Sequence, residues 1–140
     1  MEVFAEGSMQ LKNAESGEAF RYFQVISNEI ATPNVLICPA DTRQPAANIA
    51  RGFSRSNLSY FLGLDARDTN PQMFLTGDRN LTNGPLPSNR ILVLNKNCPV
   101  GWTAEMHHYQ GNIGLADGSV QQFSGGRLSE ALGTNRLAMP

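Results

Sequence analysis

Two adjacent histidines are the side chains of this chain best suited to acid–base or metal chemistry. His107 and His108 are its only histidines, and neighbouring side chains on a strand point to opposite faces, so the pair does not readily bind one metal. A zinc site needs three or four converging ligands, usually with one pair at short spacing such as HxxxH or CxxC, and the sequence contains no such pair. We therefore expect no metal here, and predict a neutral His107 that ties its loop to a polar group such as Asp78.

A nucleophilic triad is the main enzymatic alternative. It would combine a serine, or Cys38, with one of the histidines and with Asp78 or Asp117. However, no serine lies in a G-x-S-x-G elbow, and Cys38 follows an apolar run that disfavours a reactive thiolate. Asp117 belongs to a predicted turn, and no phosphate-binding glycine motif occurs. We predict that the chain is not an enzyme, has no catalytic residues and needs no cofactor.

A calcium loop is the alternative to a plain polar turn at residues 65–70. Asp65, Asp68 and Asn70 offer oxygen ligands, which calcium prefers. The stretch D-A-R-D-T-N nevertheless lacks the alternating ligands, the central glycine and the closing glutamate of an EF-hand loop. We expect a solvated turn, with a calcium loop of different geometry as the alternative.

The two cysteines, Cys38 and Cys98, are too few for a disulfide scaffold. Buried free thiols and a Cys38–Cys98 disulfide both remain open, because the sequence does not fix the distance between the two residues. Neither cysteine belongs to a CxxC pair.

The composition is typical of one ordered domain over residues 1–140. Hydrophobic residues make up 41% and charged residues 16% of the chain, which is a globular composition. The net charge of -1 provides no general basic field, so nucleic acid is not an expected partner. No apolar run approaches the roughly 20 residues that cross a bilayer.

The clearest structural prediction is a β-hairpin centred on Asp117-Gly118. Ile113 and Leu115 precede this pair and Val120 and Phe123 follow it, so both flanks can alternate apolar and polar residues. A two-residue Asp-Gly loop is typical of a type I′ turn, in which both central residues have φ > 0.

The rest of the chain predicts an α+β fold in which one N-terminal helix packs on an antiparallel sheet with long irregular loops. The helix should span residues 17–31, because Ala19, Phe23, Ile26 and Ile30 recur at helical spacing and the residue before Pro33 disfavours helix. The other expected elements are strands at 35–38, 58–64, 72–76 and 91–94, a loop at 80–90, and a short helix at 127–132. Strands 58–64 and 72–76 should pair as a hairpin, and residues 39–57 should form an irregular loop.

Four stretches share their residues, and the order in which they occur, with one bacterial family. The stretch from His107 to Asp117-Gly118 resembles the prepilin-type processing-associated His-x9-Asp-Gly proteins, which are type IV pilin-like pseudopilins related to type II secretion subunits. Residues 36–41 (LICPAD) are similar to the Cys-Pro-(small)-Asp segment that follows the helical part of these proteins. Residues 56–61 (SNLSYF) and 77–80 (GDRN) also resemble the family.

The resemblance implies a pilin-like head domain that acts as a structural subunit of a type II secretion or type IV pilus-like filament. Pilin-like proteins begin with a cleaved leader and a long apolar helix, and the sequence given has neither, so we expect it to correspond to the soluble head. The resemblance implies a cell-envelope location, periplasmic or extracellular, with the membrane reached only through that N-terminal helix. Other pilin-like subunits or secretion-system components are the implied partners. The motif residues His107, Asp117 and Gly118 are expected to be structural.

Two alternatives to a filament subunit remain. The first is a secreted or cell-surface binding module that stacks a ligand such as a glycan on Trp102 and Tyr109. The second is a small hydrolase, which would need a serine or cysteine facing His107 in an open cleft.

Overall fold

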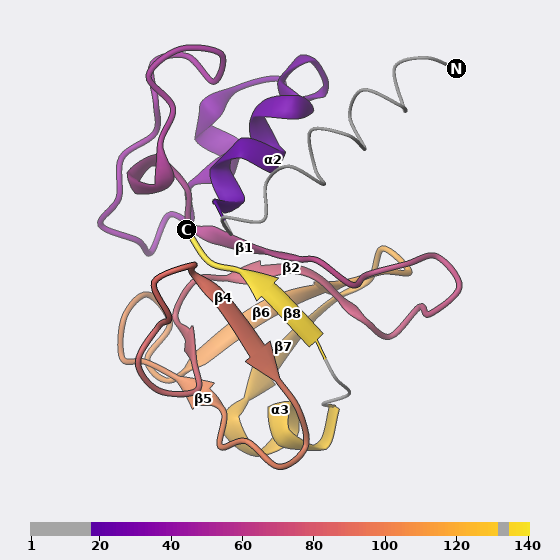
Figure 1. The fold of residues 1–140 in the computed structure, drawn as a ribbon. Coiled ribbons are helices and arrows are strands. Elements are labelled where there is room, and N and C mark those ends of the chain that lie inside the picture. The colour runs from indigo at the N-terminus through magenta and orange to yellow at the C-terminus, as the bar shows by residue number, and fades with distance from the viewer. Residues whose placement is uncertain (1–17, 132–134) are drawn as a thin grey trace.

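The chain folds around one large antiparallel sheet with a few short helices, an α+β arrangement. The computed structural model describes residues 18–131 and 135–140 (Figure 1). Six strands form the sheet in the order β4-β8-β1-β2-β6-β7, and every neighbouring pair is antiparallel. Their bounds are β1 Tyr60–Gly63, β2 Phe74–Asp78, β4 Ile91–Leu94, β6 Gln110–Leu115, β7 Val120–Ser124 and β8 Asn135–Ala138. Two short strands, β3 (Leu81–Thr82) and β5 (Gly101–Trp102), pair separately.

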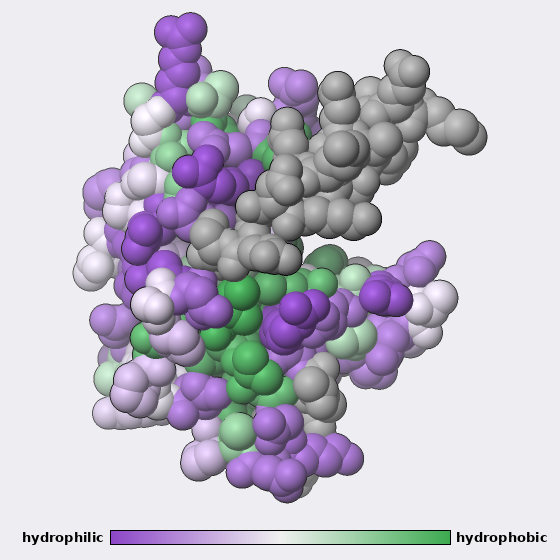
Figure 2. All heavy atoms as spheres, viewed as in Figure 1, coloured by the Kyte–Doolittle hydropathy of each residue, from purple (hydrophilic) through white to green (hydrophobic). Residues whose placement is uncertain are grey.

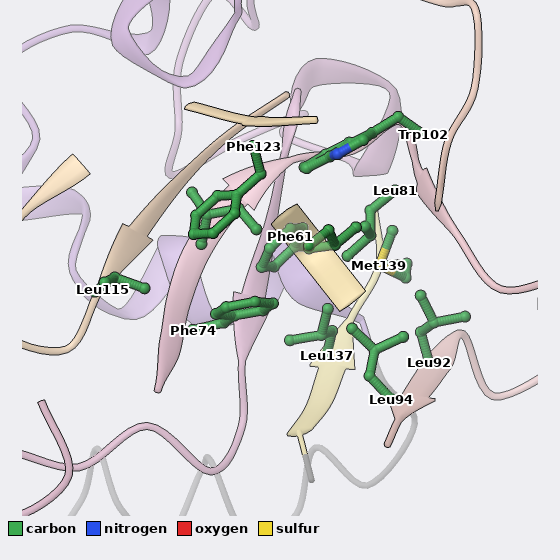
Figure 3. Close-up of a cluster of buried hydrophobic side chains, with 12 residues drawn as sticks. Phe61, Phe74, Leu81, Leu92, Leu94, Trp102, Leu115, Phe123, Leu137 and Met139 are labelled. Carbon is green, nitrogen blue, oxygen red and sulfur yellow. The ribbon is translucent and has the colours of Figure 1, made fainter. Parts of the chain in front are cut away.

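The larger hydrophobic core lies between the sheet and the layer formed by β3, β5 and the helix α3 (Gly125–Ala131). Figure 3 shows the side chains of Phe61, Phe74 and Phe123 in one cluster with Trp102 from β5. The Phe74 and Phe123 rings lie 6.0 Å apart between centroids, which is within the usual range for aromatic pairs. Burial of this cluster fixes which face of each strand points inward.

A second core lies on the opposite face of the sheet, under the helix α2 (Ala19–Val25) and the chain that follows it. Ala19, Leu36, Phe53 and Leu58 are among its buried members. The residues predicted to share one face of the 58–64 strand all contact this core: Leu58, Tyr60, Leu62 and Leu64. Phe61 points the other way, into the larger core, so the predicted alternation is confirmed.

The predicted helix is shorter than expected. α2 ends at Val25, and a 3₁₀ turn, η1 (Ser27–Glu29), replaces its last part. The segment around this boundary contains two β-branched residues, Val25 and Ile26, followed by serine and asparagine, all of which favour helix weakly. Both Val25 and Ile26 are exposed, so no core contact offsets that weakness. The predicted start of the helix at residue 17, like the predicted end of the later helix at residue 132, lies outside the described residues.

The strand predicted at residues 35–38 is wrong. The chain forms a 3₁₀ helix, η2 (Pro33–Leu36), and then an extended segment at Ile37. Thr32 caps this helix because its hydroxyl accepts a hydrogen bond from the Asn34 amide, and Pro33 occupies the first turn, where its missing N–H has no cost. A short apolar run does not by itself separate strand from helix.

The other predicted elements are confirmed with small shifts. β1 and β2 form the expected hairpin, β4 lies at the expected residues, and the predicted 80–90 loop contains the short β3. Residues 39–57 are irregular apart from one 3₁₀ turn, η3 (Arg55–Asn57). No described helix is long and apolar enough to cross a bilayer.

The predicted hairpin is present, but its turn differs from the predicted type. β6 and β7 pair from Gln110 and Ser124 to Gly114 and Val120. Gly118 has φ +88°, whereas Asp117 does not have a positive φ, so a two-residue type I′ turn is wrong. The Gly118 amide donates to the Leu115 carbonyl, and the Leu115 amide donates to the Ser119 carbonyl. These bonds are typical of a three-residue loop with a type I turn and a glycine bulge, which needs φ > 0 at the glycine alone.

Apolar side chains also reach the surface. Figure 2 shows them gathered over the middle of the visible face, where strands of the large sheet lie in Figure 1. Val93 on β4 and Val120 on β7 are 47% and 71% exposed. These two strands are the edges of the six-stranded sheet.

Candidate functional site

His107 lies in the loop between β5 and β6, three residues before β6 begins. Three residues around it have left-handed backbone angles: Met106 (φ 65°), His108 (φ 51°) and Tyr109 (φ 63°). Such angles are uncommon for residues other than glycine, and each costs free energy that the surroundings must offset. His107 turns inward and His108 is exposed, so the two side chains point in different directions as expected.

Asn80 holds this loop in place from beneath. Its side chain is buried, and its Nδ2 group lies within hydrogen-bonding distance of the carbonyls of Thr103, Glu105 and Gln110, at 3.3, 3.0 and 3.0 Å. The Asn80 carbonyl also accepts a bond from the Thr103 amide. One buried amide therefore satisfies the backbone at both ends of the loop, which explains how the strained conformation persists.

The loop brings His107 to two other side chains that could bind a metal or donate a proton. The His107 Nε2 atom lies 3.3 Å from Cys38 Sγ and 3.3 Å from Asp78 Oδ2. Cys38 and Asp78 are buried, while the His107 side chain is 26% exposed. The three ligand atoms all lie within 4.8 Å of one another. We call Cys38, Asp78 and His107 the Cys–Asp–His cluster.

The Asp78 carboxylate is held by the strand beside it. Asp78 closes β2, and its Oδ2 accepts hydrogen bonds from the backbone amide and the side-chain amide of Asn112 on β6, at 2.7 and 3.2 Å. Two donors on one oxygen stabilise a buried charge that would otherwise be costly. The Asp78 carboxylate is therefore an acceptor held in a fixed position at the C-terminal end of β2, beside β6.

The geometry of the cluster is not that of a catalytic triad. A relay needs the nucleophile on one imidazole nitrogen and the carboxylate on the other. Here Sγ of Cys38 and Oδ2 of Asp78 lie beside the same nitrogen, Nε2. In addition, the thiol is buried, which withholds it from a substrate. The expected contact of His107 with Asp78 is present, and Cys38 is an additional member that the sequence did not predict.

A second network borders the cluster. The Arg79 side chain donates two bonds of 2.7 Å to the Asp41 carboxylate and a third, of 2.8 Å, to Glu105 in the His107 loop. The Ser59 hydroxyl also donates to Asp41. Burial acts to raise the pKa of Asp41, but the bonds from Arg79 and Ser59 outweigh it and hold that pKa well below its usual range. Arg79 thus connects the 36–41 segment to the His107 loop.

The pKa of the Tyr60 phenol is affected by residues of both networks. Burial raises the pKa of Tyr60 to about 12, and the Coulombic influence of the neighbouring Cys38, Asp78 and Asp41 acts in the same direction. A phenol beside these groups stays protonated at neutral pH.

The remaining candidate residues lie elsewhere. Both cysteines are free thiols, so the structure has the unbridged alternative for Cys38 and Cys98. Asp117 accepts two bonds from Ser119 in the exposed turn, at the far end of β6 from His107. Asp65 pairs with the Arg136 side chain, which leaves it engaged by a cation rather than free for calcium.

Trp102 and Tyr109, the two rings expected to stack a ligand, do not form one exposed surface. Trp102 is buried in the larger core, where its ring packs so close to Gly111 that a Cβ there would lie 2.2 Å from it. Only Tyr109 is exposed. A ligand therefore cannot stack on both rings.

The sequence did not reveal the cluster because its members come from three separate segments. Cys38 and His107 are 69 residues apart, so no short ligand spacing marks them. Cys38, a histidine and Asp78 were one of several combinations considered for a catalytic triad, and all three residues fall within the stretches that resemble the pilin-like family. Comparisons with protein-family models, with curated proteins and with solved structures found no match to the chain.

Proposed function

We propose that this chain is the head domain of a pilin-like structural subunit, part of a bacterial type II secretion or type IV pilus-like filament. One observation carries the proposal: the separate stretches of the resemblance meet in one place. Cys38 and Asp41, Ser59, Asp78 to Asn80 and His107 form two adjoining networks. Residues that are distant in sequence but joined in space in this way are those that a shared fold would require.

The contacts of these residues favour a structural role over a catalytic one. Asp41, Asp78 and Asn80 are occupied by protein donors or acceptors and are buried or nearly so. Such groups fix the positions of loops and offer little to a substrate. The Asp117-Gly118 half of the motif makes a turn, which is again a structural task.

The edges of the sheet supply surfaces for subunit contacts. β4 and β7 are edge strands, and each carries an exposed valine, Val93 or Val120. The unpaired backbone groups of an edge strand are a template for pairing with another chain. Within the described residues, α2 begins at Ala19, which is buried in the second core.

Analysis of the native protein, recovered from the cells that produce it, tests the proposal. An antibody raised against the 140-residue chain would recover the native protein, and mass spectrometry would give its mature N-terminus. We expect a processed terminus followed by an apolar segment, recovery in the envelope fraction, and cross-links to pilin-like subunits. A native protein that starts at Met1 and is monomeric outside the envelope would contradict the proposal.

A further inference from the structure

We propose that the Cys–Asp–His cluster is a metal site that binds one Zn²⁺ ion. The inference rests on the convergence of three different ligand types around one point, and it is independent of the filament role. Linear spacing gave no reason to expect a metal, and the fold supplies the ligands that the spacing lacks. Among the described residues, this is the group of three such side chains whose ligand atoms converge.

The distances in the cluster fit a tetrahedral ion. With bonds of about 2.3 Å to sulfur and about 2.0–2.2 Å to nitrogen and oxygen, tetrahedral zinc places neighbouring ligand atoms about 3.3–3.6 Å apart. The observed separations from His107 Nε2 to Cys38 Sγ and to Asp78 Oδ2 are both 3.3 Å. All three atoms are within 4.8 Å of one another, so a small contraction completes the triangle.

Hydrogen bonding alone explains this arrangement poorly. One hydrogen on Nε2 cannot point at both Sγ and Oδ2, which lie at the same distance from it. A cation at the centre of the triangle would contact all three atoms at once. It would also place a positive charge beside the buried Asp78 carboxylate.

The charges and the ligand types select the metal. With a neutral imidazole, the ligand set carries two negative charges, one on the Cys38 thiolate and one on the Asp78 carboxylate. One divalent cation neutralises both, so the buried site would have no net charge. The sulfur ligand excludes calcium and magnesium, which take oxygen. Zinc accepts sulfur, nitrogen and oxygen together in a tetrahedral site.

The surroundings already orient the ligands as metal sites require. Asn112 donates to the Asp78 carboxylate, the kind of outer contact that fixes a ligating carboxylate. The His107 loop is held by Asn80. Because the His107 side chain is 26% exposed, an ion can enter from solvent beside it, and a water can occupy the fourth position.

Cobalt titration of the reduced, metal-free full chain tests the site directly. We expect one Co²⁺ per chain, with a thiolate-to-cobalt absorption band in the near ultraviolet that Zn²⁺ abolishes by competition. Cys38→Ser should abolish the band and weaken zinc binding by more than about 100-fold, beyond the 10–100-fold typical of outer-contact changes. Cys98→Ser and His108→Ala are the matched controls and should bind as the parent does. No band, or a band that survives in Cys38→Ser, would overturn the proposal.

A second measurement covers the case in which Cys38→Ser does not fold. In the Cys98→Ser background Cys38 is the single thiol, and bound zinc should slow its alkylation by at least about tenfold, because the metal holds the thiolate. Mg²⁺, which does not bind thiolates, should leave the rate unchanged. Equal alkylation rates with and without Zn²⁺ would equally refute the site.

Discussion

The two ends of β6 carry the two halves of one sequence motif, yet they are built in different ways. His107 precedes the strand and Asp117-Gly118 follows it, and the six residues of β6 between them span about 20 Å at about 3.3 Å per residue. At the Asp117 end the side-chain hydrogen bonds come from Ser119, two residues away, and the amides of Ala116 and Asp117 donate to the carbonyls of Met73 and Pro71. The His107 end is stabilised by residues from distant segments, such as Cys38 and Asn80.

This difference shows that the nine-residue spacing does not make the two halves one site. The nine residues between His107 and Asp117 include the whole of β6. A turn that requires a positive φ at Gly118 follows the strand, and a loop held by tertiary contacts precedes it. Changes at the His107 end should therefore cost more than changes at the turn, because each removes buried contacts rather than one backbone preference.

Removing the Asp41 charge should have the largest effect. Asp41→Asn leaves Arg79 without its buried partner, and breaking such a pair costs about 3 kcal/mol in the free energy of unfolding. The corresponding change in the exposed turn, Asp117→Asn, should cost much less, since the exposed Asp117 carboxylate accepts bonds from Ser119 and has no buried charged partner. Urea unfolding of both variants at pH 7 measures the difference. Equal losses would show that the two carboxylates are equivalent and would break the comparison.

The same pair of variants predicts a pH dependence. The pKa of Asp41 is lower in the folded protein than in the unfolded chain, so the unfolded chain binds a proton first as the pH falls. The stability that Asp41 contributes is complete well above about pH 4 and is lost as the pH falls below it. Between pH 7 and pH 3 the free energy of unfolding should therefore fall less for Asp41→Asn than for the parent chain, as unfolding curves at each pH would show. Parallel curves would exclude Asp41 as a source of acid sensitivity.

Deleting the side chain of Asn80 should have the next largest effect. Asn80→Ala removes the donor that serves three carbonyls, and unsatisfied buried groups should lower the free energy of unfolding by about 2 kcal/mol. Asn83→Ala is the matched control, because Asn83 donates one exposed bond to the Val93 carbonyl; it should cost under about 1 kcal/mol. Denaturation midpoints of the two variants compare them. Equal midpoints would mean that Asn80 does not hold the loop.

The adjacent histidines give a smaller and more local contrast. His107→Ala removes the contacts to Cys38 and Asp78 and should cost about 1–2 kcal/mol in the metal-free protein. His108→Ala changes an exposed side chain and should stay within about 0.5 kcal/mol. The measurement is a pair of unfolding curves with a chelator present. A more destabilised His108 variant would reverse the assignment of the inward-facing residue.

The sequence predicted those features that depend on neighbouring residues. The β1–β2 and β6–β7 hairpins, and the inward alternation of Leu58 to Leu64, follow from period-two patterns and turn residues. The error at residues 35–38 arose because four apolar residues fit a strand as well as a helical turn, and the Thr32–Pro33 cap decided between them.

The site was less predictable, since only the tertiary fold brings its members together. Asp78 was a reasonable partner for His107 because each could be assigned to the end of an element. The positive φ angles around His107 were not predicted, because Met106 and Tyr109 are residues that rarely adopt them. Cys38 was excluded as buried, although burial is what brings it to the cluster.

Gly118 offers the finest test, because it isolates a backbone preference from packing. A Cβ at Gly118 would meet no atom within 4 Å, so the cost of Gly118→Ala comes from φ +88° alone, and it should be about 1 kcal/mol. Gly101→Ala is the matched control, since it also has open space but no positive φ; it should stay within about 0.5 kcal/mol. At the other end of β6 the same logic runs in reverse, and His108→Gly should raise stability slightly by relieving φ 51°. Thermal or urea midpoints resolve all three variants. If Gly118→Ala and Gly101→Ala had the same unfolding midpoint, the turn after β6 would not depend on the positive φ of Gly118. The proposed difference between the two ends of β6 would then be wrong.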